Sequence, residues 1–145
     1  MTKPKIVQIT VYVLTFIVAI STIVIGSLLS VSNTNTFNTD FGNRLTGNGL
    51  GMIVVVLAML TTLDLERYSC HPNFRSYLFL AFVVFGLMLM MGGFVGIHKN
   101  YDSSSSHINY LNGLVGIGIG FIVGSIPTFT VMTCYQENNI PRINI

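Results

Sequence analysis

Four long stretches without a charged residue dominate the pattern of hydrophobic and polar positions along the chain. They cover residues 6–39, 45–63, 76–98 and 103–136, and the shortest of them has 19 residues. A helix needs roughly 20 consecutive apolar residues to cross the hydrocarbon core of a bilayer. The pattern therefore predicts four membrane-spanning helices.

The expected helices occupy the apolar parts of these stretches. A membrane β-barrel would alternate apolar and polar residues over segments of about 10 residues, whereas residues 52–60 (MIVVVLAML) are apolar throughout. Lipid offers no partner to unpaired backbone groups, which favours helix over strand. The second helix is the least clear, because its uninterrupted apolar run begins only at Leu50 and its ends depend on Gly47, Gly49 and Gly51. The expected spans are about 6–30, 47–63, 76–97 and 110–133, all in a single domain of residues 1–145.

The composition supports the same interpretation. Hydrophobic residues make up 51% of the 145 positions, and charged residues only 8%, against roughly 25% in an average soluble domain. These values exclude a disordered chain, a nucleic-acid-binding protein and an ordinary water-soluble domain. We expect an all-α membrane protein, a four-transmembrane-helix bundle whose main partner is the lipid bilayer.

The first hydrophobic stretch resembles a signal peptide in some respects. Lys3 and Lys5 precede it, and Ser30-Val31-Ser32 has the small-x-small pattern of a cleavage site. Its apolar region of about 21 to 25 residues is much longer than the usual 7–15. We therefore expect this segment to be retained as the first membrane helix rather than cleaved.

The distribution of Lys and Arg predicts the orientation, since these residues concentrate on the cytoplasmic side of short loops. An even number of spans places both termini and residues 64–75 on one side of the membrane. Five basic residues lie on that side and two on the other, in the loops 31–46 and 98–109. The expected topology is N-in/C-in. The five are Lys3, Lys5, Arg67, Arg75 and Arg142, and the two are Arg44 and Lys99.

Residues that could carry chemistry are scarce in the expected spans. The interiors of the spans defined above contain no Asp, Glu, Lys, Arg or His, which argues against proton transport, voltage sensing and bis-histidine haem binding. His98, Asp102 and His107 could form a metal or pH-sensing site. The simpler interpretation is polar residues at helix ends. We expect no enzyme activity, no cofactor and no metal site.

Two cysteines, Cys70 and Cys134, lie at the cytoplasmic membrane interface in this topology. A stable disulfide is disfavoured in that reducing compartment. Thiols next to a membrane helix are candidates for S-palmitoylation. The alternative interpretation is two inert thiols.

Glycines at regular spacing form the most distinctive local pattern. In the fourth span, Gly116, Gly120 and Gly124 recur every four residues, with Gly113 and Pro127 extending the same face and Gly118 lying off it. Small residues at this spacing let two helix backbones approach closely in lipid. The face packs either within the bundle or against a second copy or partner. Replacing Gly118 is expected to do much less damage than replacing Gly120. Complementary small residues are Gly26 with Thr22 and Ser30 in the first span, and Gly92 and Gly96 in the third.

The third span also contains Met88, Met90 and Met91. Copper transport would require methionines on one helix face, and only Met88 and Met91 share a face. We expect these side chains to fill gaps between helices, as methionine often does.

The layout resembles two families of small four-helix secretory-pathway proteins. One is the MARVEL-type family, which organises vesicles and junctions. The other is the small Golgi proteins associated with the COPI coat, which carry Leu-Glu after the second helix and Arg at the start of the third. Leu65-Glu66 and Arg75 occupy these positions here, whereas the glycine that follows the arginine in the family is Ser76. This resemblance covers roughly 45 residues.

Together these observations suggest a non-enzymatic membrane organiser or vesicle-trafficking component that packs through small-residue helix faces. Its expected partners are further copies of itself or other membrane proteins. The expected location is an endomembrane, such as Golgi or vesicles, or the plasma membrane. The alternative is an accessory subunit of a channel, transporter or energy-transducing membrane complex.

Overall fold

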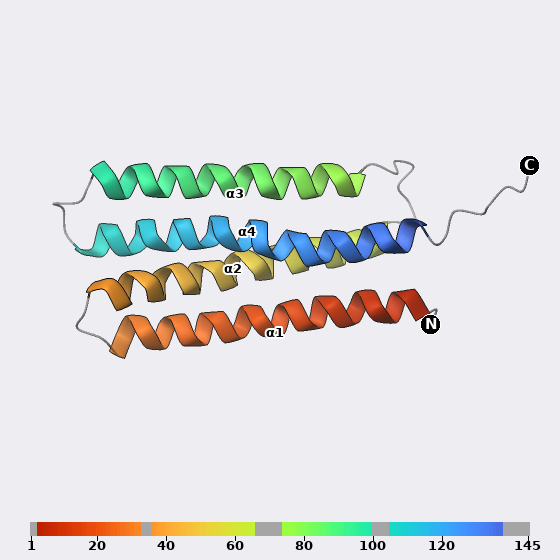
Figure 1. The fold of residues 1–145 in the computed structure, drawn as a ribbon, viewed down its shortest axis with the longest axis horizontal. Coiled ribbons are helices and arrows are strands. Elements are labelled where there is room, and N and C mark those ends of the chain that lie inside the picture. Colours follow the sequence, from red (N-terminus) through yellow and green to blue (C-terminus); the bar gives the residue numbers. More distant parts are fainter. Residues whose placement is uncertain (1–2, 33–35, 66–73, 100–104, 138–145) are drawn as a thin grey trace, which may run out of the picture.

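The computed structural model describes residues 3–32, 36–65, 74–99 and 105–137, and each of these ranges is one helix. They are α1 (Lys3–Ser32), α2 (Thr36–Leu65), α3 (Phe74–Lys99) and α4 (Ser105–Glu137) (Figure 1). All four are long and apolar enough to cross a membrane. The prediction of an all-helical protein with four such helices is therefore confirmed.

The second helix begins 11 residues earlier than expected, at Thr36 instead of near Gly47. Residues 36–46, which the sequence assigned to an outer loop, continue α2 without a break. Even the most apolar stretch of Thr36–Thr61 has a mean hydropathy of only 1.5, against 2.4 for that of Ile6–Val31, and residues 36–46 are more polar still. Hydropathy alone therefore failed to detect this part of the helix, which packs against neighbouring helices.

The helices lie in the order α1, α2, α4, α3 across the bundle, with α2 and α4 as the inner pair (Figure 1). The outer helix α1 packs mainly on α2, and the outer helix α3 packs on α4. The first helix ends and the second begins at the same end of the bundle where α3 ends and α4 begins (Figure 1). Consequently α2 and α4 run parallel to each other, while each runs antiparallel to its outer neighbour.

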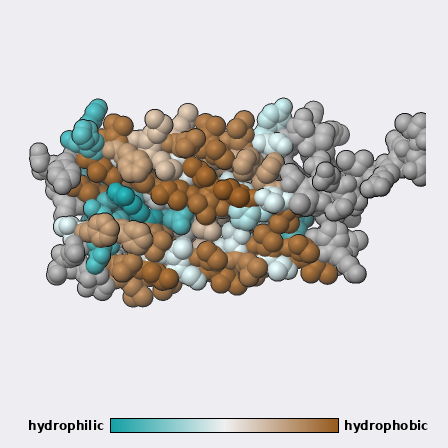
Figure 2. All heavy atoms as spheres, in the orientation of Figure 1, coloured by the Kyte–Doolittle hydropathy of each residue, from teal (hydrophilic) through white to brown (hydrophobic). Residues whose placement is uncertain are grey.

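Burial follows this order. Among the residues in the most apolar stretch of each helix, 39% in α2 and 44% in α4 are buried, against 22% in α1 and 11% in α3. On the face shown in Figure 2, most of the described residues are hydrophobic, and hydrophilic residues gather near the end where α1 and α3 stop. Such an exterior suits a lipid environment rather than water. The buried core consists of Tyr12, Val55, Val56, Met59 and Phe121.

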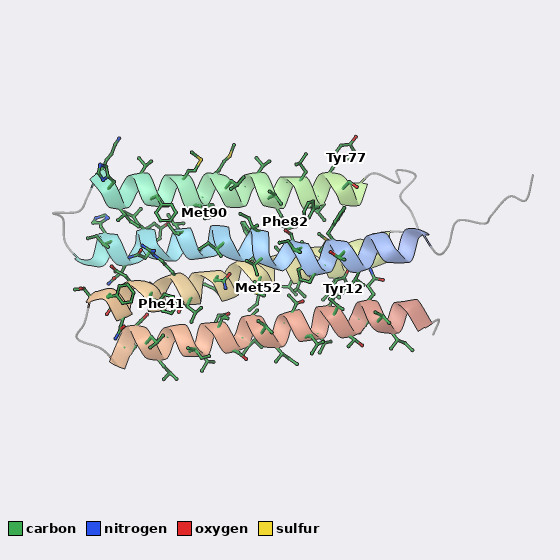
Figure 3. All side chains as sticks on the ribbon, in the orientation of Figure 1. Tyr12, Phe41, Met52, Tyr77, Phe82 and Met90 are labelled. Carbon is green, nitrogen blue, oxygen red and sulfur yellow. The ribbon has the colours of Figure 1, made fainter. Side chains whose placement is uncertain are left out.

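The three methionines of α3 do not share one role. Met88 and Met91 are 64% and 68% exposed, so the expectation that they fill gaps within the bundle is wrong for these two. Met90 lies between α3 and α4 (Figure 3), where its Cγ would be 2.8 Å from a Cβ on Gly118. The outer face of α3 thus displays long flexible side chains, while its inner face packs tightly on α4.

Candidate functional site

Glycines of α4 bring its backbone against that of α2. A Cβ added at Gly116, Gly120 or Gly124 would meet backbone atoms of α2, and at the first two positions it would overlap a carbonyl oxygen. Side chains larger than hydrogen are therefore excluded unless the helices move apart. The backbone atoms met are, in the same order, the carbonyl oxygen of Arg44, the carbonyl oxygen of Asn48 and the Cα of Met52 at 3.1 Å.

The contact is reciprocal, because α2 contributes glycines of its own. A Cβ on Gly47 would overlap the carbonyl oxygen of Gly113, and one on Gly51 would overlap that of Ile117. Small residues on both helices thus interlock over about three turns. In the described structure these faces are occupied by packing within the bundle.

Other glycines named from the sequence fall into two groups. A Cβ on Gly26 would lie 2.7 Å from the carbonyl oxygen of Gly42 in α2, and one on Gly96 would lie 2.7 Å from the Leu111 side chain in α4. A Cβ on Gly92 or Gly113 would meet nothing within 4 Å. Gly92 is therefore open to the surroundings of the bundle.

Gly118 was expected to tolerate a side chain, and this expectation is wrong. It lies off the α2-facing stripe, but a Cβ there would be 2.5 Å from the carbonyl oxygen of Gly86 in α3. A Cβ on Gly86 would in turn be 2.7 Å from the carbonyl oxygen of Gly118. The fourth helix thus uses one glycine face against α2 and another against α3.

A polar cluster crosses the α2/α4 interface near the end where α2 begins. Arg44 Nε donates a 2.8 Å hydrogen bond to the side-chain oxygen of Asn112, and the Asn112 amide donates a 2.8 Å hydrogen bond to Asp40 Oδ1. Asn112 is 1% exposed, and both charged residues are half-buried. One buried amide therefore hydrogen-bonds both a carboxylate and a guanidinium that lie one turn apart on α2.

The polar contacts extend to both outer helices. The Arg44 guanidinium lies 5.8 Å from the centre of the Phe94 ring in α3, within the range of a cation–π interaction. On the opposite side, the Ser30 hydroxyl of α1 donates a 3.1 Å hydrogen bond to the side-chain oxygen of Asn43. Polar side chains at this end thus connect all four helices.

One buried oxygen near the cluster has no described hydrogen-bond partner. Asn48 Oδ1 is inaccessible, and among the described residues nothing donates to it. Asn48 follows Arg44 by one helical turn and therefore lies on the same face of α2. Leaving such a group without a hydrogen bond costs free energy. The part of the α2/α4 interface beyond Arg44 thus contains a polar group whose hydrogen-bonding capacity the described residues do not meet.

The cluster lies at the level of apolar segments in the neighbouring helices. Arg44 is opposite Gly116 of α4 and beside Phe94 of α3. Phe94 is five residues inside the end of its apolar segment and Gly116 nine, or about 8 and 13 Å along a helix. The candidate span of α2, Thr36–Thr61, is thus longer than the expected 47–63, and the added part includes Asp40 and Arg44.

Buried polar residues at the opposite half of the bundle are largely satisfied within their own helices. The Gln8 amide donates a 3.1 Å hydrogen bond to the Tyr12 hydroxyl in α1. In α4, Thr128 Oγ1 donates to the carbonyl oxygens of Gly124 and Ser125 at 2.9 and 3.0 Å. These contacts compensate for polar side chains in an apolar interior and connect no two helices to each other.

The remaining residues named from the sequence form no site in the described structure. His98 and His107 are exposed, and among the described residues no group of three or more His, Cys, Asp or Glu could hold a metal ion. Asp102 and Cys70 lie outside the described residues, and Cys134 belongs to α4 with an undescribed side chain. The acylation hypothesis for the two cysteines thus stays a prediction.

Comparison of the chain with family models, curated proteins and solved structures finds no match. The class that the fold itself defines is a four-helix protein with four candidate membrane spans.

Proposed function

We propose that the protein is a multi-pass integral membrane protein with both termini in the cytoplasm. The apolar exterior of the four helices supports the membrane location. The excess of Lys and Arg in the termini and in residues 64–75 supports the orientation. The cluster of Asp40, Arg44 and Asn112 would then lie on the outer or lumenal side.

The orientation predicts which positions react with a membrane-impermeant thiol reagent. In a variant lacking Cys70 and Cys134, a cysteine replacing Ser104 is expected to be labelled from the outer or lumenal side. A cysteine replacing Asn139 is expected to be labelled only after the membrane is permeabilised. Mass-tag gel shifts measure both, and labelling of the two positions from the same side would contradict the proposal.

Within the membrane, we assign the protein a non-enzymatic organising or trafficking role through lateral helix contacts. The observation that carries this proposal is the unequal packing of the helices, because α3 packs mainly on α4 and only 11% of the residues in its most apolar stretch are buried. Gly92 of α3 leaves room for a neighbouring helix, and small residues favour such contacts. A second copy of the chain is the proposed occupant of this face, in a Golgi, vesicle or plasma membrane.

An accessory-subunit role is the second candidate, and the buried polar cluster favours it. Ionisable residues within membrane helices often mark functional positions, and Arg44 and Asp40 lie level with apolar segments of their neighbours. A larger channel, transporter or energy-transducing complex would use such a cluster. In that case α3 would contact a different membrane protein at a fixed stoichiometry.

Site-specific photocrosslinking in native membranes distinguishes these roles. Met88 on α3 and Leu28 on α1 are 64% and 63% exposed, so crosslinkers at the two positions form a matched pair. The organiser role predicts a homodimer band from position 88 and mainly lipid adducts from position 28. A crosslink from position 88 to one larger protein, copurifying at constant ratio in mild detergent, would favour the accessory-subunit role. No protein adduct from position 88 would contradict both.

A further inference from the structure

We infer that residues 36–46 of α2 form a docking segment that enters the membrane only together with α4, and that Asn112 is the side chain that holds it there. The inference rests on the membrane location proposed above. It concerns the helical part of α2 whose sequence is the least suited to lipid.

The docking segment has no strong tendency to enter a bilayer by itself. Its sequence, TFNTDFGNRLT, contains Asp40 and Arg44 as well as two asparagines. Charged and amide side chains oppose insertion of an isolated helix. Without partners, this segment therefore favours the aqueous side of the membrane.

The structure supplies those partners from distant parts of the chain. Asn112 follows Arg44 by 68 residues and Asp40 by 72, and it hydrogen-bonds both. The Arg44 carbonyl oxygen also packs against Gly116, which lies in α4 like Asn112. Because α4 follows α1, α2 and α3 in the chain, it is synthesised after them, and these contacts cannot form before it is made. Docking of the segment is therefore a late step.

Asn112 is the described side chain that hydrogen-bonds both charged groups of the segment. Its oxygen accepts from Arg44 and its amide donates to Asp40, while only 1% of the residue is exposed. Leucine has a similar size but neither donor nor acceptor. The Asn112→Leu variant therefore removes both hydrogen bonds with little change in volume, and the charges regain solvation only if the segment leaves the bundle.

Thiol accessibility in the full-length protein reports this movement. Phe41 lies within the segment and is 50% exposed on the bundle surface, so in the docked state a cysteine there faces lipid. With Cys70 and Cys134 replaced by serine and the protein reconstituted in phospholipid vesicles, Phe41→Cys is expected to react slowly with a charged maleimide supplied on both sides. Adding Asn112→Leu is expected to raise the rate about tenfold or more.

Two control variants isolate the effect. Asn109→Leu, three residues earlier in α4 and outside the cluster, should leave the rate unchanged. Replacing both Asp40 and Arg44 with leucine makes the segment apolar, so Asn112→Leu should then no longer accelerate labelling. If Asn112→Leu alone prevents the protein from accumulating, combining it with the replacement of Asp40 and Arg44 by leucine should restore the yield.

A cysteine at Leu57, 51% exposed in the uninterrupted apolar run of α2, separates the inference from the membrane proposal. Fast labelling at position 57 would contradict the membrane location itself. If position 57 is protected, the membrane location stands, and either of two results would then overturn the docking inference alone. The first is labelling of Phe41→Cys, without Asn112→Leu, as fast as that of the unfolded protein. The second is a labelling rate at position 41 that is the same with and without Asn112→Leu.

Discussion

Replacing Gly120 with isoleucine is expected to lower the free energy of unfolding by about 3 kcal/mol or more. A Cβ at this position overlaps the carbonyl oxygen of Asn48 and lies 2.9 Å from the Cα of Gly51. Backbone atoms cannot rotate away as a side chain can, so α2 and α4 must separate along their whole contact. Thermal unfolding of the purified protein in mild detergent measures the loss.

Gly92→Ile provides the matched control, since a Cβ there meets nothing within 4 Å. In detergent that keeps the protein monomeric, this variant is expected to unfold at nearly the parent temperature. Gly118→Ile is expected to be damaging as well, because the carbonyl oxygen of Gly86 lies 2.5 Å from the added Cβ. Equal loss of stability in Gly92→Ile and Gly120→Ile would contradict the assignment of the inner helix pair.

Asn112→Leu is expected to destabilise the folded protein by about 3 kcal/mol, since hydrogen bonds to charged groups contribute about 1.5–3 kcal/mol each. The variant leaves Arg44 and Asp40 without the buried amide that both contact. Breaking a buried polar network by removing one member costs more than replacing the whole network with apolar groups. The same unfolding measurement applies.

Removing the charges together with the amide tests that argument. The combined Asp40→Leu, Arg44→Leu and Asn112→Leu variant is expected to regain most of the lost stability, because no charged group is then left unpaired. Asn109→Leu should have only a small effect. If Asn112→Leu unfolds at the parent temperature, the cluster contributes nothing to the association of α2 with α4.

The sequence was sufficient to predict four helices, because charged residues in lipid-facing segments are costly and therefore mark the helix ends. The same reasoning failed for residues 36–46. Asp40 and Arg44 interrupt the apolar pattern, but the Asn112 side chain on α4 hydrogen-bonds both of them. Gly116, also on α4, accommodates the Arg44 backbone. A local hydropathy average contains no information about partners that lie about 70 residues away.

The glycine pattern shows a similar limit. Spacing of four placed Gly116, Gly120 and Gly124 on one face, and all three do lie against α2. Spacing did not reveal that Gly118 lies against α3, since one helix can pack on two neighbours at once. It also did not reveal that Gly92 is open, because exposure depends on where the other helices lie.

The parallel contact between α2 and α4 has a constant register. Asp40 lies opposite Asn112, and further along α2 the residues 44, 48 and 52 meet Gly116, Gly120 and Gly124, always 72 residues apart. Two identical helical hairpins related by a two-fold axis would place equivalent residues opposite each other in the same way. Here the facing residues differ, since Arg44, Asn48 and Met52 of α2 lie against three glycines of α4. The single chain therefore combines the geometry of a symmetric dimer with a complementarity that two identical copies could not achieve.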